Sequence, residues 1–174
     1  MRYFFCPLCG TKLTEKAAGD DGMVPYCAVC SKYWFDTFAS VAIVMVINEF
    51  HEIAMLQQHY LSDDYWTYVA GFMKPGETAE ETAVREVQEE LGLEIQKLEY
   101  AGTYWFGLRE QLMHGFIGHV EKRDFSLSSE VDRAEWVPFE EAPARMFPKR
   151  PGNSQHPIYE QYKAQMEGRN HDGV

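Results

Sequence analysis

Residues Gly71 to Leu93 read GFMKPGETAEETAVREVQEELGL, and this segment indicates more about the structure of the chain than any other. Its first part carries two glycines and a proline, as a loop does, and neither residue occurs again before Gly92. Thr78 followed three residues later by Glu81 is a capping box, which predicts that a helix begins here. Gly92 tolerates the left-handed conformation found at helix ends, so we expect the helix to end at about residue 91.

Three acidic residues crowd one face of this expected helix, because Glu86, Glu89 and Glu90 are spaced i, i+3 and i+4. Like charges at this spacing repel each other unless a cation neutralises them. Carboxylate oxygens suit Mg²⁺ or Mn²⁺, ions that also bridge substrate phosphates, better than they suit zinc. The simpler alternative is a solvated helix face that binds nothing.

Arg85 precedes the first of these acids and lies about a quarter-turn around the helix axis. From there it is expected to pair with Glu81 one turn back, or with Glu77 at the helix entrance. Its expected role is orientation of the site.

The whole stretch resembles the Nudix box, whose pattern is G-x5-E-x7-R-E-U-x-E-E-x-G-U, with U an aliphatic residue. At average residue frequencies such a match arises by chance in roughly one chain per million or fewer. The resemblance therefore favours a metal site over a solvated helix face. Every specified position is filled, by Gly71, Glu77, Arg85, Glu86, Val87, Glu89, Glu90, Gly92 and Leu93.

The resemblance implies a fold, the Nudix α/β/α sandwich with a mixed sheet, over residues 37 to about 167. The flanking sequence agrees, since short apolar runs predict strands at residues 41–47, 53–60, 65–70, 94–106 and 111–121. Short helices are expected at residues 139–146 and 158–167, the last closed by Gly168.

The resemblance also implies an activity. In Nudix hydrolases the box acids hold Mg²⁺ or Mn²⁺ while water attacks a phosphorus of a nucleoside diphosphate linked to another group. By position Glu86 and Glu90 match the principal ligands, and Glu89 matches a further ligand or the group that takes the water's proton. The backbone carbonyl of Ala70 often completes the metal shell in this family, and Arg85 joins the three acids in the expected catalytic set.

Four cysteines form a second pattern. Cys6 and Cys9 make one C-x2-C pair, and Cys27 and Cys30 make another after seventeen residues, which is the spacing of two zinc knuckles. Four thiolates close a tetrahedral Zn²⁺ shell with no position open to substrate, so the expected role of zinc is structural. Redox pairs and a four-sulfur iron site are the alternatives. We expect a zinc ribbon at residues 1–36 and a Nudix hydrolase domain at residues 37–174.

A ribbon in front of the box narrows the resemblance to the NADH pyrophosphatase-like branch of the family. That branch splits NADH or NAD⁺ into a nicotinamide mononucleotide and AMP, so the resemblance implies a dinucleotide substrate, with ADP-ribose and FAD as alternatives. The branch has an additional metal-binding glutamate six residues ahead of a strand tryptophan. Glu130 stands in that relation to Trp136, and Glu135 and Glu121 are weaker candidates.

The chain departs from this branch after the box, where the branch carries S-Q-P-W-P-F-P-x-S and residues 102–110 read GTYWFGLRE. Tyr104, Trp105 and Phe106 keep an aromatic character, and together with Phe72 they are the candidate residues for stacking on a flat base. The alternative is that these strand aromatics are core residues.

Acidic residues outnumber basic ones by 27 to 16, an excess that makes nucleic acid an unlikely partner. The longest uncharged apolar run, residues 41–47, is far shorter than a membrane helix, and no export signal is recognised, so we expect a cytoplasmic protein. Since related enzymes are commonly dimers, a homodimer is one option. Two other functions stay open: a nucleotide sensor or interaction module that uses the ribbon without turnover, and removal of a nucleotide cap from RNA.

Overall fold

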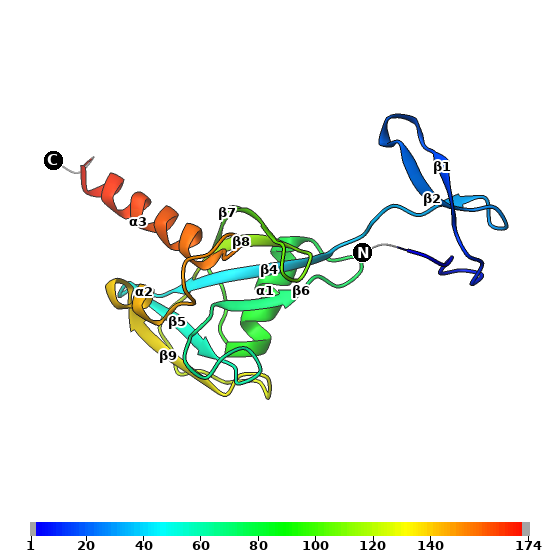
Figure 1. Ribbon diagram of the computed structural model, residues 1–174. Coiled ribbons are helices and arrows are strands. Elements are labelled where there is room, and N and C mark those ends of the chain that lie inside the picture. The colour runs from blue at the N-terminus through cyan, green and yellow to red at the C-terminus, as the bar shows by residue number, and fades with distance from the viewer. Residues whose placement is uncertain (1–2, 172–174) are drawn as a thin grey trace. The chain divides into compact units, whose positions relative to one another are not determined.

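A computed structural model describes the backbone of residues 3–171 and the side chains of residues 3–168. The chain divides into two compact units, one that ends at Phe38 and one that begins at Ala39 (Figure 1). Each unit is described by itself. The expected assignment of residues 1–36 and 37–174 to two domains stays a prediction.

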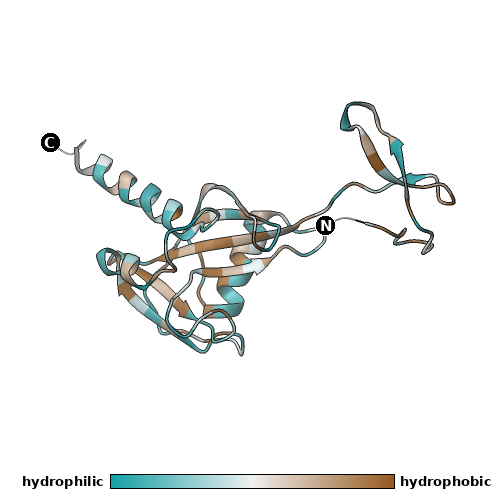
Figure 2. Ribbon diagram, in the orientation of Figure 1, coloured by the Kyte–Doolittle hydropathy of each residue, from teal (hydrophilic) through white to brown (hydrophobic). Residues whose placement is uncertain are grey.

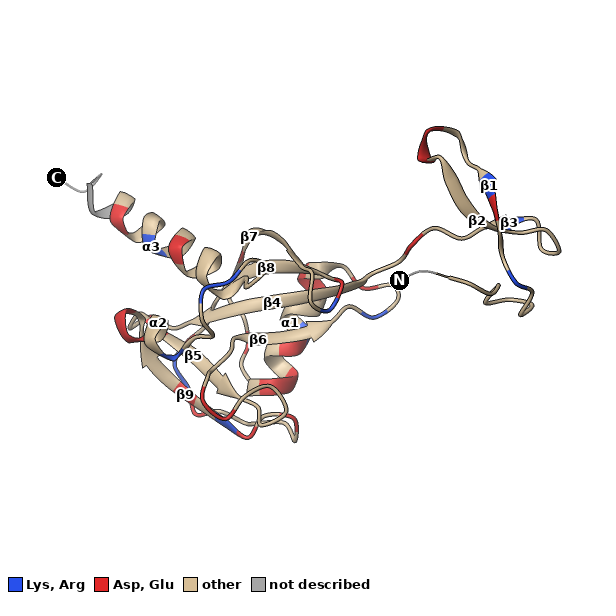
Figure 3. Cartoon of the chain, viewed as in Figure 1, with Lys and Arg blue, Asp and Glu red and all other residues tan. Residues whose placement is uncertain are grey.

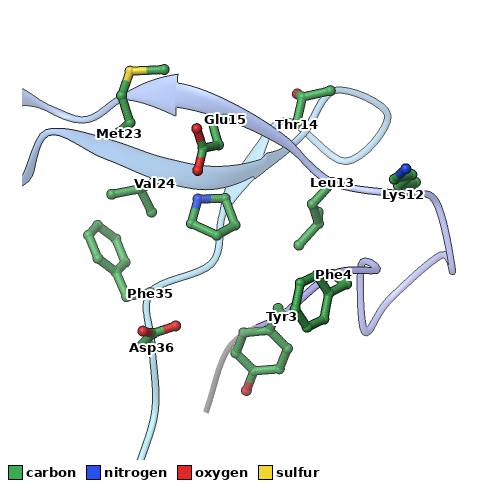
Figure 4. A pocket seen from close by; sticks show the side chains of 11 residues that line it. Tyr3, Phe4, Lys12, Leu13, Thr14, Glu15, Met23, Val24, Phe35 and Asp36 are labelled. Carbon is green, nitrogen blue, oxygen red and sulfur yellow. The ribbon is translucent and has the colours of Figure 1, made fainter.

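The smaller unit contains the strands β1 (Thr14–Ala17), β2 (Met23–Cys27) and β3 (Lys32–Tyr33), which form an antiparallel sheet in that order. Tyr3, Phe4, Leu13, Val24 and Phe35 gather around a hollow of about 400 Å³ beside this sheet (Figure 4).

This unit has almost no hydrophobic core. Of its described residues, Cys6, Val24 and Cys27 alone are buried. A unit of this size needs another source of stability, such as a metal or disulfides.

The larger unit is built on a mixed sheet. β4 and β8 run parallel, and the other neighbouring strands are antiparallel. The strands are β4 (Ala39–Ile47), β5 (Glu52–Gln57), β6 (Val69–Phe72), β7 (Lys97–Phe106), β8 (Gln111–His119) and β9 (Arg133–Pro138). They lie in the order β7-β8-β4-β5-β9, and β6 pairs with β4.

β4 is the central strand, and it is apolar along nearly its whole length because both of its faces are covered (Figure 2). Its odd-numbered residues from Val41 to Ile47 belong to one core cluster. Ala42, Val44 and Val46 belong to the cluster on the opposite face. The buried central strand predicted at residues 41–47 is confirmed.

Helices cover both faces of the sheet. The helix α1 (Ala79–Leu91) buries Ala83, Val87 and Leu91 against one face, and full burial of a side chain such as Leu91 contributes about 1.5–3 kcal/mol. The helix α3 (Gln155–His171) and the shorter segments η2 (Phe139–Glu141) and α2 (Ala142–Arg145) cover the other face. The predicted α/β/α sandwich with a mixed sheet is confirmed. None of the helices described in the chain is long and apolar enough to cross a membrane.

The boundaries of the last helix differ from our prediction. α3 begins at Gln155, where the Asn153 side chain accepts a hydrogen bond from the Gln155 N–H at 3.0 Å. It continues past Gly168, so the predicted end at that residue is wrong. A glycine ends a helix when it adopts a left-handed conformation, as Gly92 does with a φ of 69°, and Gly168 is not among the positive-φ glycines.

The two helix glycines give a matched stability test. At Gly92 an added Cβ would meet the Ser126 Cβ at 2.7 Å in a left-handed backbone, whereas at Gly168 it would meet nothing within 4 Å. We expect Gly92→Ala to lower the free energy of unfolding by about 1–2 kcal/mol or more. Gly168→Ala is expected to leave it unchanged or to raise it by up to about 1 kcal/mol.

Urea unfolding of both variants measures this difference. If the m-value is the same for both, a shift in the midpoint reports the change in the free energy of unfolding. Equal midpoints for the two variants would contradict the helix end assigned to Gly92.

Candidate active site

The acids of the site are positioned by the two ends of α1. The Thr78 side chain accepts a hydrogen bond from the Glu81 N–H at 3.1 Å, and the Glu81 carboxylate accepts one from the Thr78 N–H at 2.8 Å. Gly92 ends the helix in a left-handed conformation, and its N–H donates to the Gln88 carbonyl. The predicted capping box and helix end are confirmed. They fix where the helix begins and ends, and so the direction in which its acidic residues project. These residues are red along α1 in Figure 3.

Arg85 links the loop before α1 to the acids on the helix. Its Nε and Nη2 donate to the two carboxylate oxygens of Glu77 at 2.7 and 2.9 Å. Its Nη1 donates to Glu86 at 2.6 Å and to Glu89 at 2.9 Å. The predicted pairing with Glu77 is confirmed, and the alternative pairing with Glu81 is wrong, because Glu81 is used in the capping box.

The two hydrogen bonds from Arg85 keep the Glu77 carboxylate ionised at neutral pH. Together with the Lys74 N–H, which donates to Glu77 at 2.9 Å, the guanidinium lowers the pKa of Glu77 to about 2. The hydrogen bonds to Glu77, Glu86 and Glu89 in turn raise the pKa of Arg85. Arg85 also donates to the Phe72 carbonyl at 3.1 Å, so the end of β6 is fixed to the helix.

Glu90 is in the opposite electrostatic situation. Its side chain is buried, with a relative exposure of 3%, and burial together with the charges of Glu86 and Glu130 raises its pKa to about 8. One carboxylate oxygen, Oε1, accepts a weak hydrogen bond of 3.4 Å from Gln58. The other, Oε2, is buried with no hydrogen-bond partner. A buried polar atom without a partner is costly, and this oxygen is therefore available to a ligand.

Glu86 occupies the space that a glycine leaves open. A Cβ at Gly71 would overlap the Glu86 carboxylate, so this position in β6 cannot carry a side chain without displacing the acid. The glycine at the start of the stretch thus makes room for a carboxylate that lies next to the sheet.

The three candidate glutamates outside the helix lie in different environments. Glu135 is paired with Arg133 and with Arg145, and Glu121 is paired with Arg123 at 2.9 Å. Glu130 lies close enough to Glu90 to raise its pKa. Of the three, Glu130 is the one beside the acids of α1, and its role as a ligand stays a prediction.

These residues fit a hard divalent cation that keeps water ligands. Among the described residues, no three carboxylates bring their oxygens within 4.8 Å of one another. Magnesium is usually bound through one or two carboxylates together with waters and substrate phosphates. Arg85 holds one oxygen of Glu86 and one of Glu89, and the other oxygen of Glu89 lies 3.7 Å from the Lys74 ammonium. The unpartnered Oε2 of Glu90 and the second oxygen of Glu86 are therefore the expected donors of such a set. The predicted metal roles of Glu86, Glu89, Glu90 and the Ala70 carbonyl remain predictions.

The four candidate aromatic residues do not form one stacking platform. Tyr104 and Trp105 are neighbours in β7, so their side chains point to opposite faces of the sheet. Tyr104 and Phe106 pack against the core cluster on the α3 face, and the Tyr104 hydroxyl donates to the Ala101 carbonyl at 2.5 Å. Phe72 and Trp105 are about half exposed. A role for any of the four in substrate binding stays a prediction.

The cysteines in the smaller unit do converge. The sulfur atoms of Cys6, Cys9, Cys27 and Cys30 all lie within 4.8 Å of one another, and all four thiols are free of disulfides. The Cys6–Cys30 and Cys9–Cys27 sulfur separations are 3.9 and 3.6 Å. A tetrahedral zinc site with Zn–S bonds of about 2.3 Å has sulfurs about 3.8 Å apart. The quartet therefore fits one zinc ion.

Sequence reasoning missed one residue of the acid site. Gln58 directly follows β5, is buried, and is the residue whose side chain reaches the Glu90 carboxylate. Gln57 and Gln58 look alike in the sequence, and only the burial of Gln58 distinguishes it. No local pattern would have selected it.

A model of the NUDIX domain family matches residues 36–159. The chain is similar to a protein of Pseudomonas aeruginosa called NAD-capped RNA hydrolase NudC, with 29% identity over 140 residues, 80% of this chain and 49% of that protein. A protein of Chromobacterium violaceum with the same name is 27% identical over 145 residues, 83% of this chain and 53% of that protein.

The chain thus spans about half the length of the curated relatives it matches. Their name includes an RNA, so the comparison does not support our expectation that nucleic acid is an unlikely partner.

Solved structures share the fold. A NUDIX hydrolase from Nitrosomonas europaea superposes with a TM-score of 0.69 and 21% identity, over 97% of this chain and 93% of that one. The NUDIX domain of NrtR from Shewanella oneidensis, solved with ADP ribose, superposes with a TM-score of 0.63 and 13% identity, over 81% of this chain and 94% of that one. At these identities the likeness shows the fold alone.

The cysteine quartet predicts about one zinc per chain and a smaller unit that depends on it. Cys27→Ser is expected to abolish zinc binding and to unfold the smaller unit while the larger unit persists. Metal analysis by mass spectrometry and limited proteolysis measure both effects. Ala28→Ser is the matched control, because it adds a hydroxyl to the same knuckle and keeps all four thiolates. A parent protein that is free of metal and has an intact smaller unit would contradict the zinc site.

Proposed function

We propose that this chain, which belongs to the NUDIX domain family, hydrolyses the pyrophosphate bond of a nucleoside diphosphate derivative with the help of Mg²⁺ or Mn²⁺. One observation carries the proposal. Glu90 holds a buried carboxylate oxygen without a partner beside Glu86 and Glu130, and this arrangement is stable as an anion when a divalent cation is present.

The residues divide into those that hold the cation and those that do not. Glu86 and Glu90 would hold it, with Glu130 and the Ala70 carbonyl as further ligands. When bound, the cation supplies charge withdrawal from the bridging phosphates and a lower pKa for the attacking water.

Glu89 is proposed to take the proton of the water, or to serve as a further ligand. Its side chain is about half exposed, and it is held by Arg85 at 2.9 Å and by Lys74 at 3.7 Å. A general base needs to be ionised, accessible and fixed in place. Arg85 acts on this arrangement through its contacts with Glu77, Glu86 and Glu89, so it orients the acids.

The proposed substrate is a dinucleotide such as NADH or NAD⁺, with ADP-ribose and FAD as alternatives. Support comes from the ribbon in front of the box and from the NAD in the name of the relatives. The same name makes an RNA with a NAD cap a substrate to be tested beside the free dinucleotides. A cytoplasmic location and a homodimer belong to the same proposal.

Activity of the full zinc-loaded chain tests this function on a panel of NADH, NAD⁺, ADP-ribose, FAD and NAD-capped RNA, with Mg²⁺ or Mn²⁺. Glu90→Gln and Glu89→Gln are each expected to lower kcat by about 100-fold or more, because each removes a ligand or the base. Glu80→Gln is the matched control, since Glu80 is an exposed acid on the same helix outside the site.

A loss of less than about tenfold for both variants would contradict the proposal. Tight nucleotide binding by a folded, metal-loaded chain that forms no product from any substrate would instead support the nucleotide sensor or interaction module.

A further inference from the structure

Two loops that are far apart in the sequence meet beside Glu90. The Asp132 carboxylate accepts a hydrogen bond from the His59 backbone N–H at 2.6 Å, and its oxygens lie 2.8 and 3.0 Å from His59 Nδ1. The Asp132 backbone N–H donates to the Gln57 carbonyl at 3.1 Å. Asp132 therefore holds the residues on both sides of Gln58.

These hydrogen bonds of Asp132 to His59 and Gln57 fix the position of Gln58, which lies between them. It is buried, with 5% relative exposure, and its amide donates to Oε1 of Glu90. Its carbonyl accepts from the Leu61 N–H at 2.8 Å, so the chain turns directly after it. With Oε1 engaged by Gln58, the oxygen of Glu90 that is left for a cation is Oε2.

The segment that carries Glu130 is tied at both of its ends. At one end the Ser128 N–H donates to the backbone carbonyl of Glu90 at 3.3 Å. Within the segment, the Glu130 N–H donates to the Ser128 hydroxyl at 3.3 Å. At the other end, Asp132 is fixed to the exit of β5 by the contacts described above. Glu130 is thereby held next to Glu90 from two directions.

We propose that His59 and Asp132 form a positioning clamp, which holds Gln58 on Glu90 and keeps the segment of Glu130 beside Glu90, so that less rearrangement is needed when a divalent cation binds. This inference rests on the proposed function. The His59 and Asp132 side chains are 73% and 45% exposed, and an exposed pair of this kind contributes little to global stability. Its loss is therefore expected to change the affinity for the cation more than the stability of the fold.

Binding of Mn²⁺ alone tests the clamp on the full zinc-loaded chain without substrate. Electron paramagnetic resonance of free Mn²⁺ gives the dissociation constant, and thermal unfolding shows whether each variant is folded. We expect Asp132→Ala to weaken Mn²⁺ binding by about tenfold, as loss of an outer-shell partner does, and His59→Ala, which keeps the backbone bond to Asp132, to weaken it by about fivefold. His59→Asn keeps a donor close to the position of Nδ1 and is expected to bind within about twofold of the parent.

His119→Ala is the matched control. His119 also contacts a carboxylate, that of Glu99 at 2.7 Å, in the strand pair β7–β8. This variant removes the same kind of pair elsewhere and is expected to keep the Mn²⁺ affinity of the parent.

These measurements distinguish failure of the clamp from failure of the proposed function. Parent-like Mn²⁺ affinity in folded His59→Ala and Asp132→Ala, with weak binding by Glu90→Gln, would overturn the clamp and leave the proposed function standing. Weak binding by a folded His59→Asn would also overturn it, because a donor is present. Parent-like binding by Glu90→Gln would count against the cation site itself, and both the clamp and the proposed function would then fail.

Discussion

Repulsion among carboxylates is the constraint on which the rest of the site depends. Glu77, Glu86, Glu89 and Glu90 belong to a single loop and helix, and Arg85 alone binds three of them. Glu90 lies outside the reach of this guanidinium and is buried beside the charges of Glu86 and Glu130. A single arginine thus holds three of the four acids, and Glu90, which it does not hold, keeps a buried carboxylate oxygen without a hydrogen-bond partner.

The two candidate metal sites of the chain differ in the donor atoms that they offer. The four cysteines of the smaller unit offer soft sulfur donors whose spacing fits a tetrahedral zinc ion, and such an ion is expected to stabilise a unit with very little hydrophobic core. The acids of α1 are hard oxygen donors that leave room for water and phosphate. Since the donor types differ, the two sites are expected to favour different ions, zinc at the thiols and magnesium or manganese at the acids.

Local patterns in the sequence predict much of this arrangement. The capping box at Thr78, the helix end at Gly92 and the pairing of Arg85 with Glu77 follow from spacing along one helix, and the cysteine quartet follows from two C-x2-C pairs. The contacts of Gln58 with Glu90 and of His59 with Asp132 span 32 and 73 residues. They depend on which loops the sheet topology brings together, and no local pattern contains that information.

Strand geometry limits one of our predictions, and the structure contradicts another. Tyr104, Trp105 and Phe106 alternate in a strand, so they were never able to face one base together. Because glycine permits a left-handed conformation, the sequence predicts a helix end at Gly168, but that residue stays helical. A glycine can adopt a left-handed conformation but does not have to. At Gly92, Ser126 packs against the glycine and leaves no space for a side chain.

Binding of a cation to Glu90 is expected to release a proton, and this release can be measured. The Glu90 pKa of about 8 means that without a cation the carboxyl is mostly protonated at pH 7, and binding to Oε2 requires the anion. Titration calorimetry in two buffers of different ionisation enthalpy is therefore expected to show release of about one proton per Mg²⁺ at pH 7, and almost none well above pH 8. Glu90→Gln should abolish this release. Tight Mg²⁺ binding at pH 7 without proton release would show that the cation does not bind to the Glu90 carboxylate.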